Sequence, residues 1–165
     1  LNDLAVDYID LLLIHWPLPK VGKYVDTWRA MIDLQQEGKV RSIGVSNFTV
    51  EHLDRLASET AVVPAVNQIE MHPYFPQAEL RAYHAEHGIV TESWSPLGRG
   101  SELLAAAPIA DAAAAHGVTP GQVVLRWHVQ LGAIPLPKSS NPDRQRQNLD
   151  VFGFELTDDE VLLAV

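Results

Sequence analysis

The sequence has no cysteine among its 165 residues, which excludes disulfide bonds and thiol catalysis. It has no run of 18 apolar residues, so no membrane-spanning helix is expected, and its first residues do not form a secretory signal. Basic residues are few: 12 lysines and arginines stand against 21 aspartates and glutamates, for a net charge of −9. Such a charge argues against nucleic-acid binding. We therefore expect a cytoplasmic protein that binds neither nucleic acid nor membrane.

Core-forming residues are abundant, at 47% hydrophobic, and the length suits a single domain over residues 1–165. Short apolar runs alternate with amphipathic segments along the chain. We predict strands at residues 8–14, 40–45, 65–69, 89–94 and 133–136. We predict helices at residues 26–37, after Thr49, and at residues 77–87, 102–115, 119–131 and 142–149.

Local signals mark several helix ends. Gly38 suits a helix C-terminus, and Thr49 suits an N-cap. Thr119 is a further N-cap candidate, with Pro120 in the first turn behind it. Thr157 and Glu160 have the spacing of a capping box, which predicts a final helix carrying Val161, Leu162 and Val165.

Regular alternation of strand and helix indicates an α/β fold with a parallel sheet. A doubly wound open sheet and a (β/α)8 TIM barrel both fit this pattern. The open sheet usually carries a glycine-rich phosphate turn, whereas no G-x-G-x-x-G occurs here. The barrel is therefore favoured. It takes about 250 residues and eight strands, so five strands predict a partial barrel, truncated at the N-terminus and at the C-terminus. Its open sheet edges should promote aggregation or pairing with a complementary chain.

Polar or aromatic residues stand at or near the ends of the predicted strands. They are His15-Trp16, Ser46-Asn47, Asn67-Gln68, Glu70, Trp94-Ser95 and Lys138-Ser139. In parallel barrels, function sits at the carboxyl ends of the strands. Buried polar groups need partners, which here are either a polar ligand or one another. The repetition over successive strands favours a ligand.

Several strings together resemble the aldo/keto reductase family, over almost the whole chain. They are Asp7-Tyr8-Ile9-Asp10-Leu11 with Ile14-His15-Trp16-Pro17, Gly44-Val45-Ser46-Asn47-Phe48, Val66-Asn67-Gln68-Ile69-Glu70 with His72-Pro73-Tyr74, Ser95-Pro96-Leu97-Gly98 and Pro137-Lys138-Ser139. Trp94, where many members have tyrosine, resembles the prokaryotic 2,5-diketo-D-gluconate reductase-like branch. The resemblance implies the last five βα units of the barrel. It also implies NADPH-dependent reduction of a small aldehyde or ketone to the alcohol, by a full-length protein that is monomeric.

The resemblance also implies roles for individual residues. His15 is similar to the catalytic histidine that polarises the substrate carbonyl, and Trp16 to a residue lining the substrate pocket. The expected cofactor-binding residues are Ser46, Asn47, Gln68, Trp94, Ser95, Leu97, Lys138, Ser139, Ser140, Asn141, Arg144 and Asn148. The amides suit the nicotinamide carboxamide, and Trp94 would stack on its ring. Three basic residues and one acidic residue within 138–146 suit the 2′-phosphate of NADP(H).

The chain also departs from the family. Gln147 stands where many members have an acidic residue, and Arg99 where others have a small or amide residue. The catalytic Asp, Tyr and Lys of the family find no counterpart, and Tyr8 lies at the wrong end of its strand. The resemblance thus implies a fragment that is inactive alone.

Two alternatives remain open: a non-catalytic nucleotide-binding redox sensor on the same fold, and a metal-dependent barrel hydrolase. No metal site is expected, because His84 and His87, at i and i+3, lack a third ligand and are interpreted as surface residues. His52, His116 and His128 have no motif around them.

Overall fold

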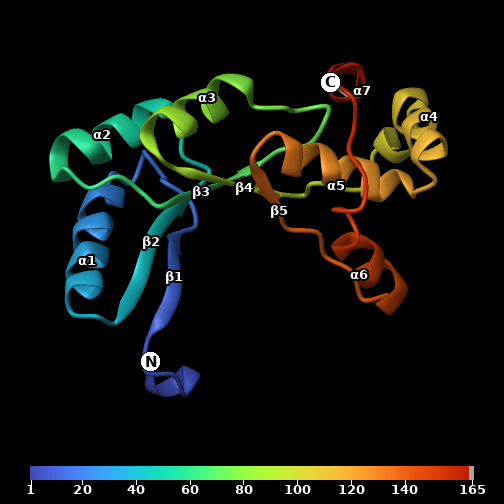
Figure 1. Cartoon of the computed structure of the whole chain (residues 1–165). Helices are drawn as coiled ribbons and strands as arrows, with labels where there is room; N and C mark the ends of the chain where they lie inside the picture. The colour runs from blue at the N-terminus through green and yellow to red at the C-terminus, as the bar shows by residue number, and fades with distance from the viewer. Residues whose placement is uncertain (164–165) are drawn as a thin grey trace. The chain divides into compact units, whose positions relative to one another are not determined.

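The chain forms an α/β structure with a parallel sheet, seen in a computed structural model that describes residues 1–163 (Figure 1). The five strands follow one another in chain order, β1-β2-β3-β4-β5. The residues group into two compact units. Unit 1 comprises Leu1–Ile69 with Ala78–Thr91, and unit 2 comprises Glu70–Gln77 with the described residues from Glu92 onward.

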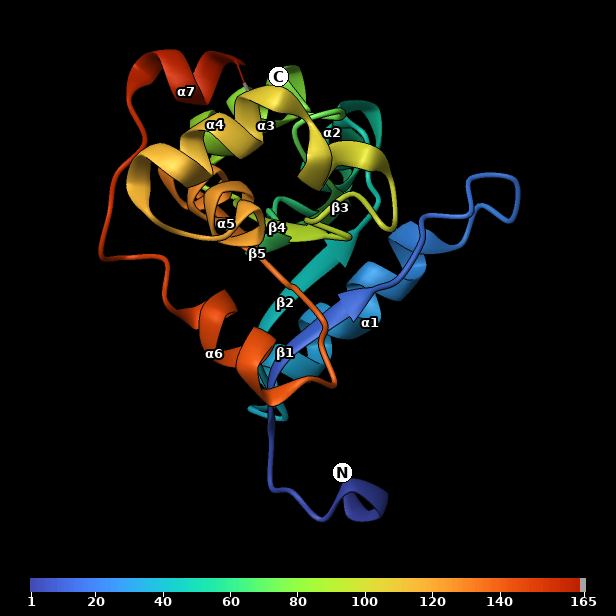
Figure 2. The same ribbon diagram turned by 90° about the vertical axis from the view of Figure 1, so that its right-hand side faces the viewer.

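Unit 1 repeats a strand and a helix three times. A 3-10 turn at Asn2–Leu4 comes first. The elements after it are β1 (Ile9–Ile14), α1 (Tyr24–Gln36), β2 (Val40–Ser46), α2 (Val50–Thr60), β3 (Val66–Glu70) and α3 (Ala78–His87). The last residue of β3, Glu70, belongs to unit 2. β1 pairs in parallel with β2, with Leu12 opposite Ile43. β2 pairs in parallel with β3, with Ser46 opposite Gln68. Figure 2 shows the arrows of β1 and β2 pointing the same way.

The core of unit 1 lies between these strands and helices. Trp28 and Met31 of α1 are buried, as the predicted apolar face of that helix requires. α1 begins two residues earlier than expected and ends before Gly38, whose φ of +74° is the left-handed conformation that glycine accepts readily. The indole N–H of Trp28 donates to the main-chain oxygen of Val62 at 3.2 Å, so this large side chain is both packed and hydrogen-bonded.

Gly44 allows a close approach in the middle of β2. A Cβ added there would lie 2.7 Å from Leu13 Cδ2 and 2.7 Å from the main-chain oxygen of Val66. Carbon atoms essentially never come so close, so any side chain at Gly44 would force the neighbouring strands apart. The packing of β1 and β3 against β2 thus depends on this glycine.

Unit 2 contains the end of β4 (Val90–Trp94) and the elements after it. These are a 3-10 turn (Glu102–Ala105), α4 (Ala107–His116), α5 (Pro120–Gln130), β5 (Ala133–Pro135), α6 (Pro142–Leu149) and α7 (Asp158–Leu163). α5 is the buried helix of this unit, with Val123, Val124, Leu125 and Trp127 at most 1% exposed. Its capping box is formed by Thr119 and Gln122, whose side chains bond to each other's main-chain N–H.

The single helix expected over residues 102–115 is wrong. Ala106 is extended, with φ −62° and ψ 135°, and separates the 3-10 turn from α4. Pro108 lacks an N–H and is tolerated only in the first turn of a helix, so a new helix begins just before it. The other expected helices and the five strands are confirmed within a few residues, including the Thr157–Glu160 capping box. Val165 lies outside the described residues.

The segment after α6 is fastened to α5 by side chains of that helix. Gln122 donates to the main-chain oxygen of Asp150 at 2.7 Å, and Trp127 donates to that of Val161 at 3.1 Å. Gln130 donates to the oxygen of Leu156 and accepts from its N–H. Further along, His116 of α4 lies 2.9 Å from the Glu160 carboxylate of α7. The irregular stretch 150–157 is therefore held through its backbone.

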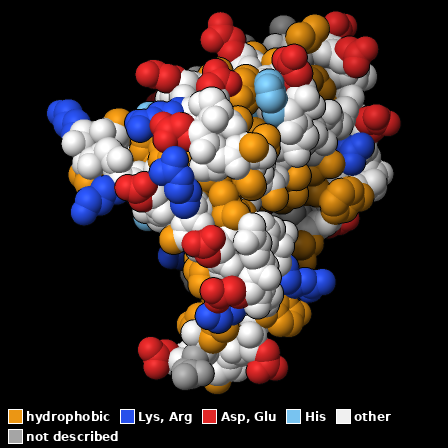
Figure 3. All heavy atoms as spheres, turned by 90° about the vertical axis from the view of Figure 1, so that its left-hand side faces the viewer, with side chains coloured by type: hydrophobic (Ala, Val, Ile, Leu, Met, Phe, Trp, Pro, Cys, Tyr) orange, Lys and Arg blue, Asp and Glu red, His pale blue; other side chains and the backbone are white. Residues whose placement is uncertain are grey.

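Within residues 1–163, no helix is long and apolar enough to cross a membrane. On the face shown in Figure 3, basic side chains are scattered among acidic and apolar ones. The described residues on that face therefore present no broad basic surface, in keeping with the acidic composition.

Candidate functional site

In unit 1, polar groups at the carboxyl ends of β1 and β2 meet Gln68 of β3. The Ser46 hydroxyl donates to the main-chain oxygen of Gln68 at 2.8 Å, and the Asn47 N–H donates to the same oxygen at 2.9 Å. The Asn47 side-chain amide donates to the main-chain oxygen of His15 and to Ser46 Oγ, both at 3.0 Å. Hydrogen bonds therefore link the Ser46 and Asn47 side chains to each other and to the main-chain oxygens of His15 and Gln68, two of the residues expected near them.

Asn47 turns the chain at the end of β2. Its φ of +63° is left-handed, a conformation that asparagine accepts more readily than most residues. The left-handed turn places Asn47 where its amide reaches back to β1. The sequence therefore uses asparagine here for its backbone as well as for its side chain.

The bonds of Ser46 restrict what it can offer a ligand. A hydroxyl has one donor hydrogen and two acceptor lone pairs. The hydrogen goes to Gln68, and one lone pair receives the Asn47 amide. Toward a further polar group, Ser46 is consequently an acceptor, which suits the NH₂ of a carboxamide.

His15 and Trp16 follow β1 directly and are exposed, Trp16 to 49%. Their ring centroids are 6.2 Å apart. An exposed imidazole next to a large indole, directly after β1, gives unit 1 a polar donor and an apolar wall. This composition is typical of a small-molecule site.

In unit 2, Trp94 ends β4 and is followed by a tight turn over residues 95–98. Ser95 has φ +50°, and its main-chain oxygen accepts from Gly98 N at 3.0 Å. Trp94, Ser95 and Leu97 are all partly buried. Gly98 itself has φ +72°, and an added Cβ would meet Ser101 Oγ at 2.5 Å, so the turn depends on glycine there.

The second polar group of unit 2 surrounds the start of α6. Asn141 is the N-cap: its side-chain oxygen accepts from Asp143 N at 2.9 Å and from Arg144 N at 3.1 Å. Ser139 accepts from Asn141 N, and its main-chain oxygen accepts from the Gln145 amide at 2.7 Å. The predicted residues Ser139 and Asn141 therefore set the backbone of this loop.

The charged side chains of this group are exposed. Lys138, Ser140 and Arg144 all lie at the surface, and Arg146 pairs with Asp143 at 2.6 Å across one turn of α6. Of the basic residues noted within 138–146, Arg146 thus has an acidic neighbour, which leaves Lys138 and Arg144 as the cations best suited to an added phosphate.

A pocket of about 550 Å³ lies beside this loop. It is lined by Pro135, Leu136, Pro137, Gln145, Asn148 and Leu149. The walls are apolar, with two amides among them, which suits a flat heteroaromatic ring with polar edges. Of the expected cofactor-binding residues, Asn148 contributes to this pocket.

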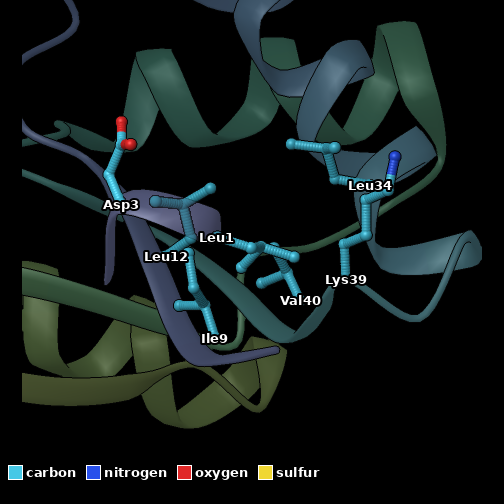
Figure 4. A pocket seen from close by; sticks show the side chains of 7 residues that line it. All are labelled: Leu1, Asp3, Ile9, Leu12, Leu34, Lys39 and Val40. Carbon is cyan, nitrogen blue, oxygen red and sulfur yellow. The ribbon is translucent and has the colours of Figure 1, made fainter. Parts of the chain in front are cut away.

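A larger pocket of about 630 Å³ lies in unit 1, at the other end of its strands (Figure 4). It is lined by Leu1, Asp3, Ile9, Leu12, Leu34, Lys39 and Val40. Ile9 and Val40 begin β1 and β2, so this pocket is at their amino ends, away from His15 and Asn47. Function in parallel α/β proteins sits at the carboxyl ends, and we assign this pocket no chemical role.

The sequence interpretation of His84 is wrong, because its side chain is fully buried in unit 1. Its ring nitrogens bond to Asn67 at 3.0 Å and to Thr91 at 2.8 Å, and burial lowers its pKa to about 4. His87 is exposed and stacks on Tyr83 at 3.9 Å. His52, for which no motif was found, accepts from the Thr49 N–H as the third residue of α2. Within residues 1–163, no group of three or more His, Asp and Glu side chains could hold a metal ion.

The chain is similar in sequence to several named reductases. The sequence profile of the aldo/keto reductase family matches residues 1–163. 2,5-Diketo-D-gluconic acid reductase B of a Corynebacterium species is 65% identical over 98% of this chain, which spans 58% of that protein. Methylglyoxal reductase DkgA of Escherichia coli is 49% identical, again over 98% of this chain and 59% of its own length.

Solved structures give the same result. A variant of Gox0644 in complex with NADPH aligns with a TM-score of 0.92 at 53% identity, over 96% of this chain and 58% of that one. The chain thus spans less than two thirds of the length of the relatives that it matches. A profile match over almost all residues, joined to identities well above one third, shows that the chain belongs to the aldo/keto reductase family.

Proposed function

We propose that this chain supplies the histidine and the nucleotide-binding residues of an NADPH-dependent reductase of small aldehydes or ketones. The observation that carries the proposal is the hydrogen-bonded group at the ends of β1 and β2. There the side chains of Ser46 and Asn47 bond to each other and to the main-chain oxygens of His15 and of Gln68 in β3. Relatives named for carbonyl reduction, and a related structure solved with NADPH, support it.

The residues fit such a nucleotide in both units. In unit 1, the Ser46 acceptor and the amides of Asn47 and Gln68 complement a carboxamide, which has one acceptor oxygen and two donor hydrogens. In unit 2, Lys138 and Arg144 suit the 2′-phosphate that distinguishes NADPH from NADH, and Asn148 lines an apolar pocket fit for a base. Trp94, Ser95 and Leu97 would lie around the nicotinamide ring. Ser139, Ser140 and Asn141 would hold the phosphate-binding loop.

NADPH supplies the hydride when bound. His15 orients the carbonyl by donating an imidazole N–H to its oxygen, where negative charge develops during reduction. Trp16 excludes water and shapes the substrate pocket. Electrostatic donors of this kind contribute about 3–4 kcal/mol to transition-state stabilisation in other enzymes.

We further propose that turnover requires a proton donor that these 165 residues do not provide. The family's catalytic Asp, Tyr and Lys have no counterpart in the strings matched here, and the chain would then supply the last five βα units of a (β/α)8 barrel. The expected location in the cytoplasm and the expected monomeric state of the full-length protein stay predictions.

Two measurements on purified protein test the proposal. The chain should bind NADPH more tightly than NADH in a fluorescence titration, and should show little or no turnover of methylglyoxal. Joining to it the part of the Corynebacterium reductase that lies outside the matched region should produce turnover, which His15→Ala should then abolish. Failure of the chain to bind NADPH would refute the proposal. Robust turnover by the chain alone would refute the need for a further donor.

A nucleotide-binding sensor remains the rival function. It would bind NADPH yet stay inactive after the same fusion, so the fusion separates the two.

A further inference from the structure

The turn at Asn47-Phe48 positions two of the proposed carboxamide ligands, Asn47 and the preceding Ser46. This turn requires stabilising contacts from other parts of the chain. Asn47 is left-handed, so the turn does not follow from the ordinary backbone preference of the strand. Phe48 anchors its apolar side: the ring is 1% exposed and packs edge-on against Tyr24, with centroids 5.5 Å apart. Its main chain must also find partners, because buried N–H and C=O groups are costly when unpaired.

Asn67 of β3 provides those partners. Its side-chain oxygen accepts from Phe48 N at 3.4 Å, and its Nδ2 donates to the Phe48 main-chain oxygen at 2.9 Å. The Asn67 side chain is completely buried. One amide therefore holds both polar groups of the Phe48 backbone, as a neighbouring strand would.

His84 of α3 in turn stabilises Asn67. The Asn67 Nδ2 has two hydrogens; one goes to Phe48, and the other points to His84 Nε2 at 3.0 Å. Nε2 must therefore be the unprotonated acceptor, so the ring proton resides on Nδ1. There it donates to Thr91 Oγ1 at 2.8 Å. Given the Asn67 orientation set by the Phe48 N–H and C=O, this chain of bonds has a single consistent tautomer.

The alternative orientation of Asn67 would be unfavourable. Rotating the amide by half a turn would place its oxygen opposite the acceptor Nε2 and its NH₂ opposite the Phe48 N–H. The contact with the Phe48 N–H would become repulsive in a fully buried site, and the contact with Nε2 would too unless the ring proton moved to Nε2. The Phe48 main chain thus sets the amide orientation that holds the turn, and His84 stabilises it by accepting the second Nδ2 hydrogen.

We propose that His84 is a positioning residue for the cofactor-contacting turn, acting through Asn67 on Phe48 and so on Ser46 and Asn47. The inference rests on the proposed function, because it assumes that this turn meets the nucleotide. His84 touches neither cofactor nor substrate in this role.

The test compares one substitution of His84 that removes its hydrogen-bonding groups with one that keeps such groups. His84→Leu removes the acceptor, whereas His84→Gln can present an oxygen to Asn67 and an NH₂ to Thr91. We expect His84→Leu to weaken NADPH binding about tenfold, the effect of leaving one buried polar group unpaired, and His84→Gln to recover most of it.

Amide hydrogen exchange gives a readout that needs no cofactor. In His84→Leu, the Asn47 and Phe48 amides should exchange faster by a larger factor than the core amides of α1, such as that of Met31. His128→Leu is the matched control: His128 is equally buried, but bonds to the oxygens of Val124 and Met71 in unit 2, and its loss should leave the Phe48 amide unchanged.

The outcomes are distinguishable. If His84→Leu speeds exchange at Phe48 no more than at Met31, or if His84→Gln recovers nothing, His84 only packs and the inference is wrong. If the unsubstituted chain does not bind NADPH at all, the proposed function fails, whatever the exchange data show.

Discussion

The polar residues of unit 1 and those around α6 in unit 2 are held in different ways. At the ends of β1 and β2 and beside β3, side chains bond to main-chain oxygens and to each other, and little of Ser46 or Asn67 is exposed. Around α6, side chains such as Ser139 and Asn141 hold the loop, while Lys138 and Arg144 project from the surface. The first arrangement favours shape and hydrogen-bond complementarity. The second favours attraction of an anion, which is sensitive to salt.

The largest expected effect breaks the close packing of unit 1. Gly44→Ala should lower the free energy of unfolding by about 2–3 kcal/mol, because the added methyl meets the Val66 main chain. Urea denaturation measures it. Gly121→Ala in the first turn of α5 is the control, since an added Cβ there meets nothing closer than 4.0 Å and alanine favours a helix. Equal losses in the two variants would contradict the special role of Gly44.

The next prediction concerns the cations of unit 2. Lys138→Ala and Arg144→Ala should each weaken NADPH binding roughly ten- to a hundredfold, as expected for a charge-assisted hydrogen bond to phosphate. NADH binding should change little, and Arg146→Ala, which only breaks a surface pair with Asp143, should have a small effect. Titrations with both nucleotides decide the matter. Equal losses for NADPH and NADH would rule out recognition of the 2′-phosphate.

The next prediction concerns how the stability of the fold depends on pH through His84 in unit 1. His84 has a folded pKa of about 4, below its usual 6.5, because it is buried. Its neutral form stabilises the fold fully above pH 6.5, and the unfolded chain gains the proton first as the pH falls. From pH 7 to 5 the free energy of unfolding should therefore drop by about 1–2 kcal/mol through this residue. Denaturation curves of His84→Gln should lack that part of the drop; identical slopes would contradict the prediction.

A smaller effect should distinguish hydrogen bonding from charge. Asn47→Ala should weaken binding of NADPH and NADH alike, by about fivefold each, since a carboxamide is common to both. Raising the salt concentration should weaken NADPH binding to this variant as much as to the unsubstituted chain. If Asn47→Ala weakened the binding of NADPH alone, the two assignments would have to be exchanged: the 2′-phosphate would belong to the polar residues of unit 1 and the carboxamide to those around α6.

The smallest effect concerns the contact between α4 and α7 in unit 2. Glu160 accepts from His116 and from the Thr157 main chain, and these bonds hold the pKa of its carboxyl below the usual value. Glu160→Gln should cost about 0.5–1 kcal/mol of stability. Amide exchange should rise in α7 and stay unchanged at Phe48. A change at Phe48 would show coupling between the units.

Much of the fold follows from local sequence. The strands are short apolar runs, and the helix ends are marked by Thr119, Asn141 and Thr157, whose caps depend only on residues two or three positions away. The break at Ala106 was equally local, because Pro108 signals it, but the alanine-rich stretch around it favours helix strongly.

The candidate site was predictable as a set of residues but not as a network. Motifs identify Ser46, Asn47 and Gln68, whereas the bonds that orient them involve main-chain groups of other strands. His84 was missed for the same reason: its partner Asn67 is 17 residues away. The spacing of His84 from Leu80 was a usable signal that His84 is buried. His84 follows Leu80 by four residues, which puts both side chains on one helix face, and Leu80 packs against the core.

The fastening of residues 150–161 by α5 has a consequence for how this part of the chain tolerates mutation. Gln122, Trp127 and Gln130 donate hydrogen bonds to main-chain oxygens, which every amino acid possesses. Val151 and Leu156 have buried side chains, and Thr157 and Glu160 form side-chain bonds of their own. Apart from these, residues 150–161 should therefore accept most replacements, whereas Gln122, Trp127 and Gln130 should accept few. A library randomised over both stretches would recover diversity mainly from the stretch that is held through its main chain.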